Sequence, residues 1–233
     1  RNLILMELEK RQGPTLKSIM QFAFFHLMPL AAIYTGATAF DWWLCLGLYY
    51  FRMFWITGGY HRYFSHKTYK TSRVFQFIIA FFAETSSQKG VLWWAAHHRV
   101  HHKTSDTPAD PHSMKLYGFW YSHMGWIASS EYKSTDFDSI QDYAKFPEIR
   151  WIDKHYVFPV LTMAIAVFTI GGFANSESVS QGMMMLGEGA WSLQGALSSL
   201  LIGFLLSTAI LFHGTFSINS IMHKIGNKRY KSG

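Results

Sequence analysis

The sequence predicts an all-α membrane protein, with four transmembrane helices and a His-rich helical cap on the cytoplasmic side. Three observations lead to this prediction. Only 15% of the 233 residues are charged and 49% are hydrophobic, whereas an average soluble domain has about 25% charged residues. Four apolar runs approach the length that crosses a bilayer. The basic residues are confined to segments that fall on one side of such a chain. The single cysteine, Cys45, excludes a disulfide framework.

The first two predicted spans lie close together in the sequence. Residues 18–38 form an almost uninterrupted apolar run that contains His26. A lone histidine in a span usually hydrogen-bonds to a neighbouring helix, so we assign no metal-ligand role to His26. Residues 39–41 are too few for anything but a tight turn, and residues 42–57 return across the bilayer. Arg52, near the end of this second span, is expected to extend toward the membrane interface.

The middle of the chain, residues 58–154, is polar and rich in His, Lys, Arg and Trp, and we predict that it forms the cytosolic cap. Residues 74–83 are apolar but only about half as long as a span, which favours an in-plane or re-entrant helix over a crossing. The third and fourth predicted spans are residues 156–174 and 191–212, joined by a loop over residues 175–189.

The distribution of basic residues predicts the orientation. All 21 Lys and Arg lie in residues 1–17, in residues 52–154 or after residue 222. Because cytoplasmic segments carry the excess of Lys and Arg, both termini and the cap are predicted to be cytoplasmic. The basic excess is therefore an orientation signal and a surface for membrane lipid or acyl carriers. We find no nucleic-acid-binding motif and predict no nucleic-acid partner.

The segment that follows residue 97 carries the first cluster of candidate metal ligands. Each residue of a helix advances by about 100°, so His98 and His102 share one face while His101 points elsewhere. Imidazole is the commonest side-chain metal ligand. A helix with this spacing can serve two metal ions, although a row of surface histidines is the simpler alternative.

A second cluster comprises His61 and His66, which are five residues apart. On an ideal α-helix they would be separated by about 140°. One metal could collect both only at a frayed helix end, and Gly58 and Gly59 would supply the necessary freedom.

A third candidate lies at the end of the fourth span, where Asn219 and His223 share a helix face. An amide beside an imidazole suits a metal ion and its bound water, and a hydrogen-bonded helix end is the alternative. All three clusters are predicted to meet at one membrane face. At least six histidines argue for two metal ions, and imidazole ligands indicate Fe, Zn, Cu or Ni. Spacing alone does not choose between iron and zinc.

The motifs together resemble those of the integral-membrane delta-9 fatty acyl desaturases of the stearoyl-CoA type. They are HRYFSH at 61–66, HRVHHK at 98–103, DPH at 110–112, SHMGW at 122–126 and NSIMH at 219–223. The resemblance implies one membrane desaturase domain over residues 1–233, holding two iron ions. It further implies dioxygen as co-substrate, a fatty acyl-CoA or acyl-lipid substrate, and a separate electron donor, either a ferredoxin or a b-type cytochrome with its reductase.

The same resemblance assigns individual residues. The ligands of one iron would be His61, His66, His98 and His102, and those of the other His101 and His223, with Asn219 holding an iron-bound water. Gln88, Trp94 and Thr215 would line the bend of the acyl tunnel. We expect His112 and His123 to orient ligands, and we assign no ligand role to His97 or His213.

Two departures from the family pattern bear on these expectations. Phe216 stands where animal members carry Trp, which affects the shape of the tunnel. The family also has a third box, HxxHH, downstream of the Asn-His motif, and the sequence ends at Gly233 without it. We therefore expect a fragment cut at both ends.

Two other functions remain as alternatives. A His-box membrane hydroxylase, acting on alkanes, sterols or carotenoids, would share the iron and the topology, but the box spacing and the DPH motif favour a desaturase. A His-rich metal carrier would place its ligands near the bilayer midplane and not at span ends. The sequence leaves the acyl carrier open. The short loops favour a bacterial inner membrane over the endoplasmic reticulum.

Overall fold

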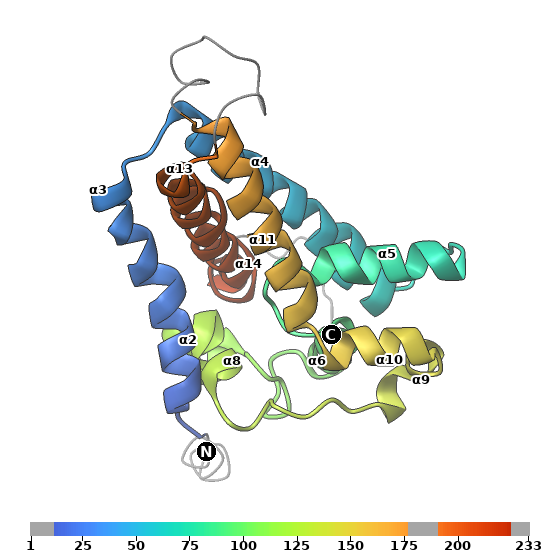
Figure 1. Cartoon of the computed structure of the whole chain (residues 1–233). Helices are drawn as coiled ribbons and strands as arrows, with labels where there is room; N and C mark the ends of the chain where they lie inside the picture. The colour runs from blue at the N-terminus through green and yellow to red at the C-terminus, as the bar shows by residue number, and fades with distance from the viewer. Residues whose placement is uncertain (1–11, 177–190, 225–233) are drawn as a thin grey trace.

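The computed structural model describes residues 12–176 and 191–224, and its regular elements there are helical. The long helices lie side by side, and the shorter helices gather toward one end of the bundle (Figure 1). Most of the loop predicted after the third span, and the chain after residue 224, lie outside the described residues.

The helices of the bundle come from both ends of the chain. They are α2 (Leu16–Leu27), η1 (Met28–Ala31), α3 (Ala32–Thr35), α4 (Ala39–Trp55), α11 (Val157–Ala174), α13 (Leu193–Ser198), η5 (Ser199–Leu206) and α14 (Ser207–Lys224). The helices between them in sequence are η2 (Ile56–Ser65), α5 (Arg73–Glu84), α6 (Val91–Thr104), α7 (Met114–Trp120), η3 (Tyr121–Gly125), α8 (Trp126–Ala128), η4 (Asp138–Ile140), α9 (Gln141–Ala144) and α10 (Pro147–Lys154).

Three helical segments of the described chain are long and apolar enough to cross a membrane. They are Leu16–Thr35, Val157–Ala174 and Leu193–His223, and they coincide with the first, third and fourth predicted spans. The second predicted span falls on α4, which has 17 residues and continues directly into η2. Because α4 packs against η5 and α14, it belongs to the bundle. The crossing by α4, and with it the four-span topology, stays a prediction.

The connection between the first two helices differs from the predicted turn over residues 39–41. Ala39 already begins α4, and Thr38 is its N-cap residue. The Thr38 side chain accepts from the backbone N–H of Asp41, and the Asp41 carboxylate accepts from the backbone N–H of Thr38. This capping box satisfies two otherwise unpaired donors, so the chain turns earlier, at Gly36, where φ is +74°.

Arg52 does not reach the membrane interface, so that expectation was wrong. Its side chain is fully buried in the bundle. Nη1 donates to Thr208 Oγ1 at 2.6 Å, Nη2 to Ser207 Oγ at 2.5 Å, and Nε to the Leu48 carbonyl at 3.1 Å. These hydrogen bonds satisfy a buried cation and tie α4 to the start of α14.

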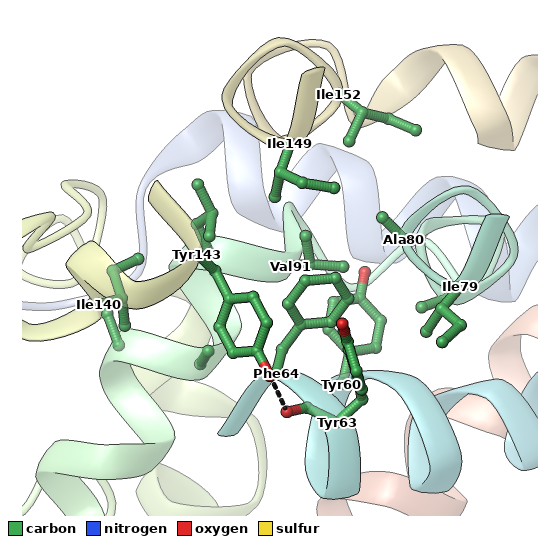
Figure 2. Close-up of a cluster of buried hydrophobic side chains, with 14 of the residues drawn as sticks. Tyr60, Tyr63, Phe64, Ile79, Ala80, Val91, Ile140, Tyr143, Ile149 and Ile152 are labelled. Carbon is green, nitrogen blue, oxygen red and sulfur yellow. Dashed lines mark hydrogen bonds between the residues drawn. The ribbon is translucent and has the colours of Figure 1, made fainter. Parts of the chain in front are cut away.

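A hydrophobic core fixes the cap helices to one another. Tyr60 and Phe64 of η2 pack with residues of α5, α6, α9 and α10 (Figure 2). The Tyr143 hydroxyl donates to the Tyr63 carbonyl at 2.9 Å within this core. As predicted, α5 is too short to cross a bilayer, with 12 residues, and it contacts η2, α10 and α11. The core therefore holds η2 and α6, the two histidine-bearing helices, in one orientation.

Candidate metal centre

A π-helix, and not a frayed end, brings His61 and His66 together. The chain from Ile56 to Ser65 winds as η2, in which hydrogen bonds span five residues. The His66 backbone N–H donates to the His61 carbonyl at 3.0 Å. The wider winding places residues i and i+5 near one face, and the two rings lie 4.5 Å apart. The expected frayed helix end at Gly58 and Gly59 was therefore wrong, because both glycines lie inside η2.

Two buried carboxylates fix the start of α6, the helix that carries three of the candidate ligands. Glu84 accepts a hydrogen bond from Val91 N at 3.0 Å, and Asp153 accepts from Leu92 N at 2.8 Å. Burial is the main cause that raises the pKa of both acids. These acceptors satisfy unpaired N–H groups at the helix N-terminus. A Cβ atom at Gly90 would lie 2.0 Å from Asp153 Oδ1, so the close contact between residue 90 and Asp153 requires glycine.

Arg99, between two candidate ligands, ties α6 to the end of η2. Its Nη atoms form a double hydrogen bond with the Asp142 carboxylate, at 2.9 and 3.0 Å. The guanidinium also donates to the carbonyls of Phe64, Ser65 and Ser139. All five of its N–H groups are thereby used. The arrangement holds His98 opposite His66.

Four imidazoles converge on one point. The ligand atoms of His61, His66, His98 and His102 all lie within 4.8 Å of one another. His98 Nε2 is 3.1 Å from His66 Nε2 and 3.0 Å from His102 Nε2. Two nitrogens bound about 2.1 Å from one metal would be separated by about 3.0 Å at a right angle. We call these four residues the four-histidine cluster, and their spacing fits a shared metal ion.

The electrostatics of this cluster favour the neutral imidazoles that metals require. Burial, followed by the charges of the neighbouring imidazoles, lowers the pKa of His98 to about 2. The same two causes, burial first, lower the pKa of His61 and His102. Neutral imidazole is the form that coordinates a metal. The cluster is therefore ready to bind at neutral pH.

A second candidate site lies around His101, next to the four-histidine cluster, with the rings of His101 and His102 5.5 Å apart. His101 donates through Nδ1 to the Asp110 carboxylate at 2.8 Å, which leaves Nε2 available for a metal, as in carboxylate–histidine–metal arrangements. Burial alone would raise the pKa of Asp110, but the hydrogen bond from His101 and two backbone N–H groups lower it. The His223 ring lies 5.5 Å from the His101 ring.

His112 lies in this second site, where we had expected only an orienting residue. Its ring stacks on His101 at 4.1 Å. His101, Asp110 and His112 each offer a ligand atom within 4.8 Å of the others. Its Nδ1 is buried and has no hydrogen-bond partner among the described residues. Burial, then the charge of His101, lowers its pKa to about 3. Asp110 and His112 therefore join His101 and His223 as candidate ligands.

A largely apolar cavity opens beside both sites. The three residues predicted to bind substrate lie in its wall: Gln88 donates to Thr215 Oγ1 at 2.8 Å, and Trp94 stacks on His98 at 4.6 Å. His98, His112 and Asn219 also line the cavity. His97 lies in the wall too, and its Nδ1 pairs with the Trp93 carbonyl at 2.8 Å. The cavity wall thus contains the three predicted substrate residues and two of the predicted metal-site residues, His98 and Asn219.

Sequence reasoning missed four residues that hold the ligands in place. Arg99 and Asp110 lie inside or directly after the histidine motifs, so their position was a usable signal. There was no signal for Glu84 or Asp153 in the sequence, because these residues cap α6 from two other helices, α5 and α10.

Comparison with known proteins identifies the relationship. No protein-family model matches the chain. An acyl-CoA C20 Delta5-desaturase from Anemone leveillei is 26% identical over 220 residues, which cover 90% of this chain and 62% of that protein. An sn-2 palmitoyl-lipid 9-desaturase from Nostoc sp. (strain 36) is 27% identical over 95% of this chain and 72% of its own length. Over most of its length, the chain is similar in sequence to fatty acyl desaturases.

The desaturase relatives also show how far the relationship extends. Stearoyl-CoA desaturase 5 from Bos taurus is 29% identical over 75% of this chain but only 48% of its own length. The chain spans 62% of the length of the Delta5-desaturase named above, and 58% and 64% of the length of two other relatives. Relatives are named for double bonds at positions 5, 9 and 11, and for both acyl-CoA and acyl-lipid substrates. Relationship alone therefore fixes neither the position nor the carrier.

Proposed function

We propose that this chain belongs to an oxygen-dependent desaturase that introduces a cis double bond at the delta-9 position of a saturated fatty acyl chain. One observation carries the proposal. The apolar cavity is lined by residues of both histidine sites and by the Gln88–Thr215 pair. An acyl chain in this cavity would pass directly beside His98. The delta-9 position is supported by the motif resemblance and by relatives named as 9-desaturases.

The four-histidine cluster would hold one iron ion. The other would be held by His101 and His223, with His112 or Asp110 beside them and Asn219 holding a water. Metal ions at these sites would supply the oxygen activation that breaking an unactivated C–H bond requires. Imidazole ligands also suit zinc, so the metal content of the protein is the direct test of iron.

The residues of the chain perform the remaining tasks. Trp94, stacked on His98, would fix the position of the acyl chain relative to the four-histidine cluster. The hydrogen bond between Gln88 and Thr215 closes one wall and satisfies both polar groups, which leaves that wall dry. Phe216 is buried in the same wall. The cavity would thus select a bent acyl chain and exclude water from the reacting methylene groups.

The reaction consumes one dioxygen, two electrons and two protons for each double bond, and releases two waters. The electrons would come from a separate one-electron carrier, a ferredoxin or a b-type cytochrome. We place the protein in a bacterial inner membrane, with the metal sites and both termini on the cytoplasmic face, because the basic residues gather there. Either acyl-CoA or acyl-lipid remains a substrate in this proposal.

Expression in a host without its own desaturase tests the proposal. We expect cis-9 monounsaturated acyl chains by gas chromatography and mass spectrometry, and iron in the purified protein. A double bond at another position would contradict the delta-9 assignment but would still support desaturase activity. Hydroxylated chains would instead indicate a His-box hydroxylase, and bound metal without any acyl product would indicate a carrier.

A further inference from the structure

A second pocket adjoins the apolar cavity and is rich in lysine. The two share wall residues that include Gln21, Lys89 and Trp93. The lysines that line the second pocket are Lys17, Lys89, Lys133 and Lys154, and we call it the four-lysine pocket. A ligand with an apolar chain in the cavity would therefore place its polar end among these lysines.

Hydrogen bonds hold together the segments that carry these lysines, which are far apart in the sequence. The Thr15 backbone N–H donates to the Ala128 carbonyl at 3.0 Å and joins the start of α2 to α8. The Trp93 indole donates to the Tyr132 carbonyl at 2.8 Å and joins α6 to the segment after α8. Asp153, near the end of α10, accepts from the first turn of α6. The pocket is therefore built by tertiary contacts and is not a chance grouping of surface side chains.

The charges in this pocket are unbalanced, and its ammonium groups repel one another. Asp153, the carboxylate among the described wall residues, is already engaged by backbone N–H groups of α6. Lys89 Nζ lies 3.3 Å from the Tyr132 carbonyl and 4.0 Å from the centre of the Trp93 ring. Burial, followed by the charge of Lys133, lowers the pKa of Lys89 to about 8. A pocket lined by one sign of charge attracts the opposite sign, so its ligand should be an anion.

The turn before α6 directs one side chain to the cavity and the next to the junction of the two pockets. The φ angle is +62° at Ser87 and +65° at Lys89, in the left-handed region that residues with side chains seldom adopt. Between them, Gln88 donates to Thr215 in the cavity wall. The Tyr60 hydroxyl donates to the Lys89 carbonyl at 2.5 Å and fixes the turn. Such backbone conformations concentrate at ligand-binding sites, and here the conformation sets Lys89 beside the polar end of a ligand.

The ends of two candidate spans place the pocket at a membrane interface. Lys17 lies in the first turn of the segment Leu16–Thr35. Lys154 lies three residues before the segment Val157–Ala174. These two ends lie at the same end of the bundle (Figure 1), which is the cytoplasmic one in the proposed orientation.

The junction of the two pockets borders the lipid. Gln21 lines both pockets and is exposed, although it belongs to the first candidate span. Exposure within a span is contact with lipid. The four-lysine pocket therefore lies at the depth of the lipid headgroups, and the cavity leads away from it beside the acyl chains.

We propose that the four-lysine pocket binds the phosphate group of a membrane phospholipid, while one acyl chain of that lipid enters the apolar cavity. The inference rests on the proposed function and deepens it by naming the acyl carrier, which is the glycerolipid itself and not coenzyme A. Lysine ammonium groups bind phosphate as point charges. An anionic lipid such as phosphatidylglycerol fits this pocket better than phosphatidylcholine, whose choline group adds a positive charge among the lysines.

Lipid binding by the purified full chain tests the pocket without any reaction. The probe is a detergent micelle that contains equal amounts of dioleoyl phosphatidylglycerol and dioleoyl phosphatidylcholine, and native mass spectrometry counts the lipids that the protein retains. We expect preferential retention of phosphatidylglycerol. Since each lysine near a membrane surface contributes a factor of about five, we expect about 100-fold weaker binding in the pocket variant, which combines Lys17→Gln, Lys133→Gln and Lys154→Gln. These three lysines are exposed, so the variant should fold.

Two controls separate the pocket from total charge and from packing. A control variant that combines Lys70→Gln, Lys115→Gln and Lys145→Gln removes the same charge from exposed positions outside the pocket, and it should bind as the wild type does. At the half-buried Lys89, Lys89→Arg keeps the charge and should retain binding, whereas Lys89→Gln should bind about fivefold more weakly. Equal retention of phosphatidylglycerol by the pocket variant and the control variant would overturn the inference.

A comparison of substrates then distinguishes the acyl carrier. Wild-type protein with an electron donor is offered stearoyl chains either as distearoyl phosphatidylglycerol in vesicles or as stearoyl-CoA. We expect the double bond on the lipid, and we expect the pocket variant to slow that reaction at least tenfold at limiting lipid. Double bonds formed on stearoyl-CoA alone would overturn the inference. Wild-type protein that retains phosphatidylglycerol but forms no double bond on either carrier would overturn the proposed function, while lipid binding by the four-lysine pocket would stand by itself.

Discussion

The four-histidine cluster differs from the histidine row of His26, His213 and His123 in how the same side chain is arranged. In the cluster, four ligand atoms converge within 4.8 Å of one another, from η2 and α6. In the row, each ring uses both nitrogens and meets a different partner on each side. Convergent nitrogens share one acceptor of electron pairs, such as a metal ion, whereas nitrogens in series share protons. The direction of the nitrogens, and not the number of histidines, distinguishes the two sites.

The supporting residues of the two regions differ in the same way. The helices of the cluster are held by ionisable side chains: Arg99 with Asp142, and Glu84 and Asp153 at the start of α6. The contacts of the row are made with backbone carbonyls and one hydroxyl. Rigid support suits a site that binds a metal, since the ligands must keep their geometry. Four substitutions or conditions, from the largest expected effect to the smallest, test this contrast.

His98→Ala should have the largest effect, because His98 Nε2 contacts the ligand atoms of both His66 and His102. We expect metal affinity at the cluster to fall by at least about 100-fold, the upper limit for loss of an orienting partner, and the acyl product to disappear. Elemental analysis and product analysis measure the two effects. The titration of His123 should be unchanged. Retained unsaturated product in this variant would contradict the metal assignment.

Arg99→Lys keeps the positive charge but cannot make the five hydrogen bonds of the guanidinium. Since hydrogen bonds to charged groups contribute about 1.5–3 kcal/mol each, we expect a loss of about 2–4 kcal/mol of stability, together with weaker metal binding. Thermal unfolding in detergent measures the first effect and metal titration the second. As a control, Arg73→Lys alters the exposed pair with Glu148, for which we expect a much smaller loss of stability because solvent screens the pair. Equal losses in the two variants would show that the Arg99 contacts contribute no special support.

Gly90→Ala should displace Asp153 from the start of α6, because the new Cβ would lie 2.0 Å from Oδ1 and 2.7 Å from the Asp153 carbonyl oxygen. Overpacking of this kind costs about 1–3 kcal/mol, so the unfolding temperature should fall and the cluster should bind metal less tightly. Gly47→Ala is the matched control, since nothing lies within 4 Å of its Cβ. It should stabilise α4 by about 0.5–1 kcal/mol. An unchanged unfolding temperature in Gly90→Ala would contradict the role of Asp153 as a helix cap.

Acid should destabilise the metal-free protein through the buried imidazoles near the sites. The pKa of His98 is lowered to about 2 and that of His112 to about 3, from 6.5. Between these values and about 6.5, the unfolded chain binds protons that the folded chain does not, so stability falls as the pH decreases. The expected slope is at most about 1.4 kcal/mol per pH unit for each histidine. Thermal unfolding between pH 7.5 and pH 5 measures it, and a midpoint that rises toward pH 5 would contradict the burial of neutral imidazoles.

The helical content and three of the apolar spans could be predicted because they follow from local sequence. Continuous apolar runs of span length need no partner to be recognised. The capping box of α4 was also readable, since Thr38 and Asp41 have the required spacing, but we placed a turn there by length alone. The burial of Arg52 could not be predicted, because it depends on Ser207 and Thr208, more than 150 positions away.

For the candidate site, the separation of His98 and His102 from His101 was predictable from helical periodicity. The close approach of His61 and His66 was not predictable, because we read no π-helix from the sequence and α-helical geometry would separate the two rings. His112 lies in the second site because the loop after α6 brings Asp110 back to His101, and this contact could not be predicted from local sequence. The contacts of His26 with His213, and of His213 with His123, join elements of three distant segments.

The sequence by itself determined the chemistry that is available: apolar helices of span length, a basic distribution that favours one face, and imidazoles at helical spacing in the cap. These properties are local, since each depends on residues within a few turns of one another. Only the tertiary structure decided which nitrogens converge and which lie in series. That choice depends on how η2, α6 and α14 are placed relative to one another, and their placement results from long-range packing and from the hydrogen bonds of groups such as Arg99 and Asp153.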